Sequence, residues 1–204
     1  MEADADLARR AAGGDTNATA ALLEQHLPQL RKSIAGQISE LWRAKLDEDD
    51  ILQITCLEAF LSIDRFASTG RGSFLGWLRT MAMNNLRDAI EGLEAAKRPN
   101  PRRQLQGVRG EDSYIALFEY LGGTTTTPSK AAARKEAKAA LLDATSKLPE
   151  EYRRVIMFYD LEDLPIDEVA ARMSRTAGAV YMLRARALER LREMLGTGSG
   201  PLPG

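Results

Sequence analysis

Residues 165–195 read PIDEVAARMSRTAGAVYMLRARALERLREML, and this stretch decides the fold of the C-terminal part of the chain. Apolar residues recur every three or four positions on both sides of the tetrapeptide Ser174-Arg175-Thr176-Ala177. They are Ile166, Val169, Ala170 and Met173 before it, and Val180, Leu183, Ala187, Leu191 and Met194 after it. This spacing predicts a short helix from about residue 165 to about 173 and a long helix after the turn, with Thr176 as its N-cap. The layout is that of a helix-turn-helix, whose second helix presents its N-terminal residues to the major groove of DNA.

A helical wheel of the long helix separates the residues expected to face DNA from those expected in the core. The face opposite the core carries Ala179, Met182 and Arg186, with Tyr181 toward one flank and with Arg175 and Thr176 at the entry. These six residues are the predicted contacts with duplex DNA. An ordinary helical hairpin with a solvated arginine-rich face would give the same pattern.

Upstream of this motif the chain also has helical periodicity, and no run alternates as a strand would. A first apolar series comprises Leu23, Leu27, Leu30, Ile34, Ile38 and Leu41, and Pro28 predicts a break or a helix start within it. The acidic cluster at 47–50 suits the start of a second helix, because carboxylates favour the positive end of the helix dipole. Ser73 is the expected cap of a third helix. We therefore predict an all-α fold.

Two small helical domains and a linker are expected. Residues 1–98 form the first domain, 99–128 a flexible linker and 129–195 the helix-turn-helix domain, and 196–204 a disordered tail. Glycine, proline and a run of threonines mark the linker, but its apolar stretch at 114–121 predicts a short helix that docks on another part of the molecule.

The net charge of −1 conceals a strong segregation of charge along the sequence. Residues 47–64 contain six acidic and no basic residues, whereas residues 172–192 contain six arginines and only one acidic residue. Residues 71–109 contain eight basic and three acidic residues. One acidic and two basic surfaces suggest a chain that touches both a protein partner and a polyanion.

Catalysis has little support in the sequence. The single histidine, His26, lies in an amphipathic helix, and the single cysteine, Cys56, lies on an apolar helix face. No Cys/His cluster has the spacing of metal ligands, and no glycine-rich phosphate loop follows a strand. We expect a non-enzymatic protein with no catalytic residues, no metal and no cofactor. One cysteine, no signal peptide and no membrane span indicate a cytoplasmic protein.

A second nucleic-acid signal lies in the first half of the chain. Trp77, Asn84, Asn85, Arg87 and Asp88 share one predicted helix, and a basic loop carrying Lys97, Arg98, Arg102 and Arg103 follows it. Stacking faces, amides and cations together are what recognition of single strands uses. Aromatic residues at helical spacing are nevertheless more often core, and an asparagine within a helix often satisfies a neighbouring carbonyl.

Two sets of residues, one in each half of the chain, carry a family resemblance. Asp50 to Thr55, Phe66, Gly72 to Arg79 and Asn84 to Asp88 resemble the second region of bacterial RNA polymerase sigma factors. Leu148 to Arg153, Glu168 to Ala170, Gly178 to Val180, Arg186-Ala187 and Leu191-Arg192 resemble the fourth region. With only these two regions, the chain is similar to the small extracytoplasmic-function (ECF) sigma factors.

The resemblance implies specific roles for these residues. Asp49, Asp50 and Gln53 would dock on the clamp helices of the polymerase's largest subunit. The Trp77 helix and the basic loop would open the −10 element and hold a flipped base. The helix-turn-helix would read the −35 duplex and rest on the flap of the second-largest subunit. An anti-sigma factor is a further partner that the resemblance allows and that the sequence does not identify.

At four positions the chain departs from the family pattern. Ile54 replaces an acidic residue, Pro165 replaces a Ser or Thr cap, Ser174 replaces a turn glycine, and Tyr181 replaces a basic residue. A left-handed Ser174 would carry strain of about 1 kcal/mol.

Two other functions fit parts of the sequence. An autonomous helix-turn-helix regulator would bind an operator as a dimer and use its N-terminal half as a sensor. An adaptor that binds only protein would leave the arginine-rich surfaces without a purpose. Co-purification with core RNA polymerase separates these readings from a sigma factor.

Overall fold

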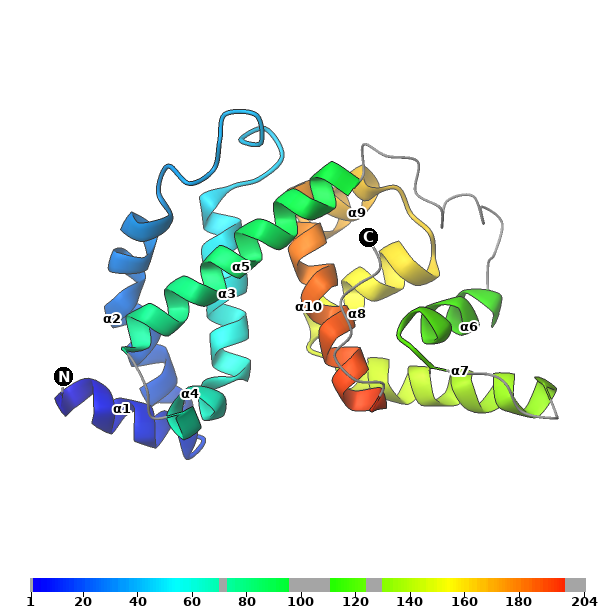
Figure 1. Cartoon of the computed structure of the whole chain (residues 1–204), viewed down its shortest axis with the longest axis horizontal. Helices are drawn as coiled ribbons and strands as arrows, with labels where there is room; N and C mark the ends of the chain where they lie inside the picture. The colour runs from blue at the N-terminus through cyan, green and yellow to red at the C-terminus, as the bar shows by residue number, and fades with distance from the viewer. Residues whose placement is uncertain (1, 70–72, 96–110, 124–129, 197–204) are drawn as a thin grey trace. The chain divides into compact units, whose positions relative to one another are not determined.

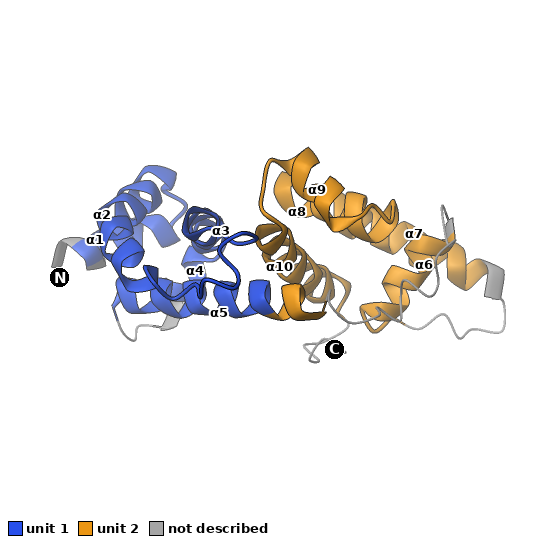
Figure 2. Cartoon of the chain, turned by 90° about the horizontal axis from the view of Figure 1, so that it is seen from above, with its two compact units in different colours: residues 1–90 blue, residues 91–204 orange. Residues whose placement is uncertain are grey.

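The computed structural model describes residues 2–69, 73–95, 111–123 and 130–196 (Figure 1). Throughout these residues every regular element is helical, which confirms the all-α prediction. The chain divides into two compact units, residues 1–90 and 91–204, and the division falls within a long helix (Figure 2). The predicted tail begins at Gly196, whose positive φ of 67° closes the last helix, and residues 197–204 lie outside the described part.

Five helices begin in the first unit. They are α1 (Glu2–Ala12), α2 (Thr16–Ile34), α3 (Glu48–Leu61), α4 (Ile63–Thr69) and α5 (Phe74–Ala95). Helix α1 packs against α2 and α4, and α2 packs against α3. The largest side chains with almost no exposure in this unit are aliphatic: Leu22, Leu30, Ile34, Leu46, Ile51, Ile54 and Leu78.

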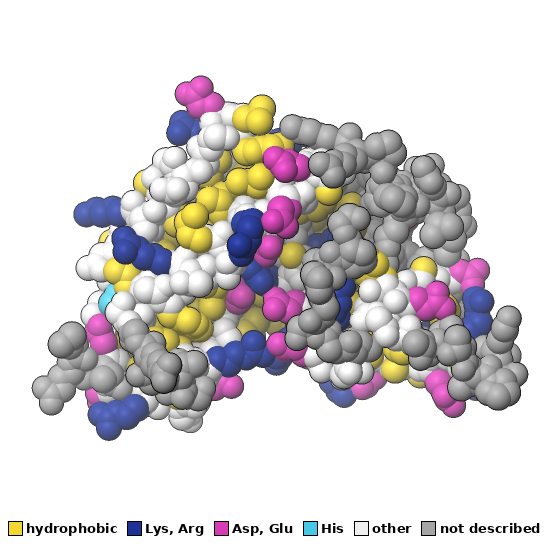
Figure 3. Space-filling view, viewed as in Figure 1, with side chains coloured by type: hydrophobic (Ala, Val, Ile, Leu, Met, Phe, Trp, Pro, Cys, Tyr) yellow, Lys and Arg dark blue, Asp and Glu magenta, His cyan; other side chains and the backbone are white. Residues whose placement is uncertain are grey.

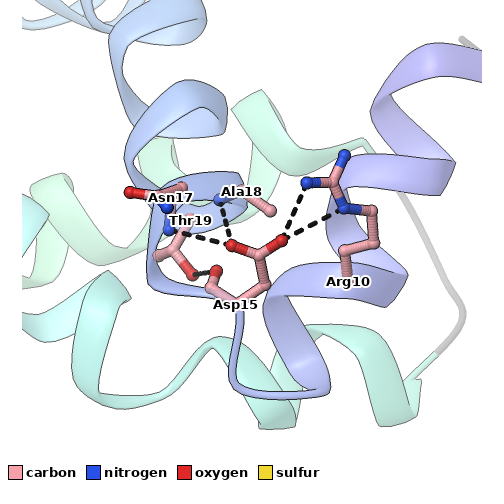
Figure 4. Close-up of polar contacts among 5 residues, drawn as sticks. All are labelled: Arg10, Asp15, Asn17, Ala18 and Thr19. Carbon is pink, nitrogen blue, oxygen red and sulfur yellow. Dashed lines mark hydrogen bonds and ion pairs between the residues drawn. The ribbon is translucent and has the colours of Figure 1, made fainter.

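Asp15 caps the start of α2 (Figure 4). One carboxylate oxygen accepts hydrogen bonds from the backbone N–H groups of Asn17 and Ala18, each at 3.0 Å. The other oxygen accepts from the Arg10 guanidinium at 2.8 and 3.1 Å. The hydrogen bond from Ala18 and the bonds from Arg10 hold the pKa of Asp15 below its ordinary value. The cap therefore ties the end of α1 to the beginning of α2.

The predicted break at Pro28 is wrong, because Pro28 lies inside the continuous helix α2. A proline within a helix costs about 3 kcal/mol. The apolar face that buries Leu22, Leu30 and Ile34 continues past Pro28 on both sides, and its burial favours one unbroken helix.

The buried face includes Leu30 and Ile34 as predicted, but the first two members of the predicted series lie one position away from it. Leu22, His26, Leu30 and Ile34 are buried, whereas Leu23 and Leu27 are only half-buried. The helix ends at Ile34, and Leu41, which was predicted to extend the series, is 70% exposed in the following turns.

The starts of α3 and α5 follow the predictions. Asp47 caps α3 by accepting a hydrogen bond from the N–H of Asp49 at 2.9 Å. The Ser73 hydroxyl accepts from the N–H of Gly76 at 3.1 Å at the first turn of α5. Both caps satisfy backbone donors that a helix start leaves unpaired.

The second unit contains the remaining elements. They are α6 (Glu111–Tyr120), α7 (Lys130–Ser146), α8 (Glu150–Val155), the π-helical segment η2 (Ile156–Leu161), α9 (Ile166–Met173) and α10 (Ala177–Leu195). Helix α10 packs against α7, α8, α9 and η2 and is the central element of the unit. Pro149 and Pro165 precede α8 and α9 without a side-chain cap.

Helix α6 confirms the short helix predicted within the linker. It packs against α7 and η2, with Ile115, Leu117 and Leu121 buried. Residues 99–110 and 124–128 of the predicted linker lie outside the described residues. The apolar stretch therefore docks on the second unit.

Candidate nucleic-acid interface

A helix-turn-helix is formed by α9, a tight turn and α10. Ser174, which stands where the family has a turn glycine, ends α9 in the left-handed conformation (φ 53°, ψ 47°). The N–H of Arg175 donates to the carbonyl of Ala170 at 3.0 Å, which closes the turn. The hydroxyl of Thr176 then accepts from the N–H of Ala179 at 3.2 Å and caps α10. The turn and the cap predicted from the sequence are both present.

Three of the six predicted duplex contacts remain partly exposed. Arg175 and Thr176 lie half-buried at the turn, and Arg186 lies half-buried on α10. The guanidinium of Arg186 pairs with Glu189 at 3.0 Å, and that of Arg175 lies 4.0 Å from Glu151. The Arg186 side chain is 14% exposed and that of Arg175 is 21% exposed, so each shows only a small part of its surface to solvent.

The other three predicted contacts do not lie on an exposed face. Ala179 and Met182 have no exposed surface, and Tyr181 is 8% exposed, with its ring at 77° to that of Tyr159 and 6.2 Å between the ring centres. The wheel assumed that one side of α10 faces solvent from its first turn. Residues 178–183 are instead buried without interruption, so the start of the helix has no solvent-facing side. Further along, Met194 is exposed rather than in the core.

A cluster of arginines beside the turn was not singled out from the sequence. The guanidinium of Arg154 donates to the backbone carbonyl of Arg172 at 2.9 Å. The guanidinium groups of Arg154 and Arg172 lie over the Phe158 ring, 5.9 and 5.5 Å from its centre respectively. The pair Arg153-Arg154, placed just before an apolar helix, was the available signal. Carboxylates lie beside both arginines: Glu151 is 3.9 Å from Arg154, and Glu168 is 2.8 Å from Arg172.

In the first unit, the predicted polymerase contacts divide by exposure. Asp49 is exposed and pairs with Arg31 at 2.6 Å, and Gln53 is exposed one turn further along α3. Asp50 is 7% exposed and Ile54 is 2% exposed. Asp49 and Gln53 are accessible to a partner, whereas Asp50 and Ile54 belong to the interior of the unit.

The residues predicted to bind single-stranded DNA also separate. Trp77 is half-buried in a cluster of rings, 5.2 Å from Phe66 and 5.5 Å from Phe74 between ring centres. Phe74 itself is buried. Arg87 is exposed and donates to the Asn84 side-chain oxygen. Asn84 and Asp88 are half-buried, and Lys97, Arg98, Arg102 and Arg103 lie outside the described residues.

Asn85 faces the interior of the first unit. Its side-chain amide donates to the Thr55 hydroxyl and to the Glu58 carboxylate, each at 3.1 Å, and it has no exposed surface. Asn85 therefore ties α5 to α3, and its partners are a hydroxyl and a carboxylate of another helix, not the neighbouring carbonyl expected from the sequence.

Hydrophobic side chains are also exposed on this unit. Phe60 and Leu61 at the end of α3 and Met83 on α5 are each exposed by two-fifths or more. Figure 3 shows hydrophobic side chains at the surface around the positions where Figure 1 labels α3 and α5, with acidic and basic groups among them.

Comparisons with known proteins match two separate stretches of the chain, one in each half. The family model described as "Sigma-70 region 2" matches residues 22–95, and the model described as "Sigma-70, region 4" matches residues 138–191. Together the two matches cover more than half of the chain. The chain is an ECF-type RNA polymerase sigma factor.

Similar proteins extend the match over nearly the whole sigma factor. RNA polymerase sigma factor CarQ of Myxococcus xanthus is 28% identical over 86% of this chain and 87% of its own length. ECF sigma factor SigD of Mycobacterium tuberculosis is 25% identical, covering 90% and 79%. The ECF sigma-E factor of Haemophilus influenzae is 26% identical, covering 98% and 96%. The sigma factor is therefore a protein of transcription initiation.

An ion pair lies in the interior of the second unit of this sigma factor. Arg184 of α10 and Asp160 of η2 form a two-pronged ion pair, with nitrogen–oxygen distances of 2.6 to 3.1 Å. Asp160 is 2% exposed and the Arg184 side chain 17%. Burial alone would lower the pKa of Arg184, but the charge and hydrogen bonds of Asp160 outweigh it and raise that pKa above its ordinary value. Arg184 stays charged inside the domain.

Neither residue considered for catalysis has a reactive setting. His26 is buried against the Phe74 ring, with Nε2 3.3 Å from an Asp4 oxygen. Cys56 is half-buried, and burial raises the pKa of its thiol. Among the described residues of this sigma factor, no cluster of His, Cys, Asp or Glu has the arrangement of a metal site. No helix in that part of the chain is long and apolar enough to cross a membrane.

Proposed function

We propose that this sigma factor binds core RNA polymerase and directs it to promoters, with the first unit holding melted −10 DNA and the second unit reading the −35 duplex. The observation that carries the proposal is the presence of both sigma-70 regions in one chain, in order. An autonomous regulator with a sensor in its N-terminal half would not need a sigma-70 region 2 there, but residues 22–95 match that region.

Polymerase docking is assigned to the exposed side of α3. The first turn of this helix is acidic at Glu48, Asp49 and Asp50, and the helix contains no basic residue. Asp49 and Gln53 offer the accessible carboxylate and amide, and the clamp helices of the largest polymerase subunit are the proposed partner. The Asp50 side chain is buried, so its proposed role is to support the fold beneath this surface and not to contact the partner directly.

Holding of the −10 strand is assigned to α5 and to the basic loop after it. Trp77 offers a partly exposed aromatic ring, and Asn84 and Arg87 form a polar pair two turns further along the helix. Stacking on aromatic rings and contacts from arginine and amide groups are the means by which proteins hold separated strands. Lys97, Arg98, Arg102 and Arg103 would neutralise phosphates.

Reading of the −35 duplex is assigned to the turn and to α10. Arg175, Thr176 and Arg186 are the partly exposed members of the predicted set. The flap of the second-largest polymerase subunit is the proposed support for this unit, and an anti-sigma factor is a proposed further partner.

Binding to purified core RNA polymerase in gel filtration tests the docking assignment. Asp49→Lys should weaken binding by about tenfold, because it places a cation where the partner is expected to supply cations. Asp64→Lys is the matched control, since it changes the charge equally at an exposed position on α4. Equal binding by the two variants would overturn the assignment. Absence of core binding by the wild type, together with tight dimeric binding to duplex DNA, would favour the autonomous regulator.

A further inference from the structure

We propose that helix α6, through Tyr120, positions the recognition helix α10 and thereby sets the strength of −35 recognition. Helix α6 lies outside both stretches that the sigma-70 models match. The inference rests on the proposed function of the second unit, and it concerns a segment to which that function assigns no role.

The ring of Tyr120 spans two turns of α10. The Arg184 guanidinium lies 5.9 Å from the ring centre and the Arg192 guanidinium 5.6 Å. Residues eight apart fall on one side of a helix, and Leu188, midway between these arginines, has no exposed surface. Tyr120 thus lies along the 184–188–192 side of the recognition helix.

Arg184 is held from three directions. Asp160 binds the guanidinium through both carboxylate oxygens. The centre of the Tyr159 ring lies 5.0 Å from the guanidinium, and that of the Tyr120 ring, on α6, lies 5.9 Å from it. Because the Asp160 side chain is 2% exposed and that of Arg184 17%, little water is in reach to replace a lost partner. The guanidinium therefore links three elements, namely α6, η2 and α10.

The position of Arg184 makes this link relevant to DNA. Arg184 lies two residues before Arg186 on the same helix, and Thr176 caps that helix two turns earlier. A rotation or shift of α10 relative to α6 and η2 moves all the proposed duplex contacts together. Misplacement of contacts by about 1 Å is enough to lose much of their binding energy. Tyr120 is a positioning residue in this account and does not itself touch DNA.

The other aromatic residue of α6 provides an internal control. Tyr114 is also half-buried, but the cation over its ring is Lys138 of α7, at 5.8 Å. Replacing Tyr114 with leucine therefore removes a ring from the contact between α6 and α7 and leaves the Tyr120 ring beside α10 in place. Replacing Tyr120 with leucine keeps an apolar side chain but removes the π face, whereas Tyr120→Phe keeps that face.

The test uses full-length protein in holoenzyme with core RNA polymerase. The probe is the tightest fragment that wild-type holoenzyme selects from a pool of randomised promoter duplexes, together with the same fragment scrambled in its −35 element. Tyr120→Leu should weaken binding to the selected fragment by about tenfold and leave binding to the scrambled fragment unchanged. Tyr120→Phe and Tyr114→Leu should each bind the selected fragment as tightly as wild type does.

Hydrogen exchange on the same variants reports whether the helix is displaced. In Tyr120→Leu the backbone amides of α10 around Arg184 should exchange faster, while those of α3 should not change. Equal binding by Tyr120→Leu and wild type, or equal losses in Tyr120→Leu and Tyr114→Leu, would refute the positioning role. If wild-type holoenzyme selects no −35 sequence, the proposed function fails instead, so the two failures are distinguishable.

Discussion

Removal of Asp160 should destabilise the second unit far more than removal of any surface carboxylate. Asp160 is 2% exposed and binds a guanidinium that is itself largely buried. Breaking a buried pair by removing one member costs about 3–5 kcal/mol, because the remaining charge has lost its partner. Asparagine at position 160 can still accept one hydrogen bond. We therefore expect Asp160→Asn to lower the free energy of unfolding by about 3 kcal/mol, the lower end of that range.

Urea unfolding of the full chain measures this loss, and the sequence supplies a probe for each unit. Both tryptophans, Trp42 and Trp77, lie in the first unit, so their fluorescence reports that unit alone. Circular dichroism reports helices in both. With a slope of about 1.5 kcal/mol per molar urea, 3 kcal/mol moves the midpoint of the second unit by about 2 M. The tryptophan-detected transition should not move.

A matched control and a double replacement complete the test. Asp143 pairs with Lys147 at 2.6 Å on α7, but both side chains are more than 60% exposed. Asp143→Asn should therefore change the stability by less than about 0.5 kcal/mol. Asp160→Leu combined with Arg184→Met should cost far less than the sum of the single changes, since no charge is left buried. Additive losses, or a midpoint shift below about 0.5 M for Asp160→Asn, would refute the reasoning.

Three further predictions follow from single residues. Ser174→Gly should stabilise the second unit by about 0.5–1 kcal/mol in the same urea assay, because glycine relieves the left-handed strain; a loss of stability would contradict it. Cys56 should react with iodoacetamide more slowly in the native protein than in urea at pH 8, because the thiolate is the nucleophile and burial raises the pKa of the thiol; equal rates would show an open site. Asp15, whose pKa is lowered, should stabilise the first unit at neutral pH and lose that contribution as the pH falls below about 4; Asp15→Asn should show a weaker dependence of the tryptophan-detected midpoint on pH in this range.

Local signals in the sequence predicted much of the fold. A cap needs only a side-chain oxygen two or three residues before a backbone N–H, so Asp47, Ser73 and Thr176 could be recognised from their neighbours. The turn of the helix-turn-helix followed from the same kind of signal. These features depend on contacts within a few residues of one another.

Features that depend on distant contacts could not be predicted in this way. Pro28 predicted a break because its own cost is local, whereas the burial that offsets it comes from other helices. Arg184 and Arg192 were counted with a basic surface, yet both are buried against Tyr120 from a segment expected to be linker. The burial of Ala179 and Met182 likewise depends on neighbours that a helical wheel does not contain.

The candidate site was therefore predicted better as a set of elements than as a set of side chains. The acidic helix and the helix-turn-helix were placed correctly, but Asp50 and Asn85 lie in the interior of the first unit. Neighbouring residues on a helix differ by 100° in direction, so a small error in the assumed face exchanges a surface residue for a core residue.

Transcription from selected promoters tests the central claim most directly. Core RNA polymerase, this protein and a pool of randomised duplex fragments are incubated together, and the fragments that yield run-off transcripts are sequenced. We predict transcripts only when the protein is present, from fragments that share two sequence elements at a fixed spacing. Transcripts that do not depend on the protein, or selected fragments with a single palindromic element bound equally well without polymerase, would contradict it.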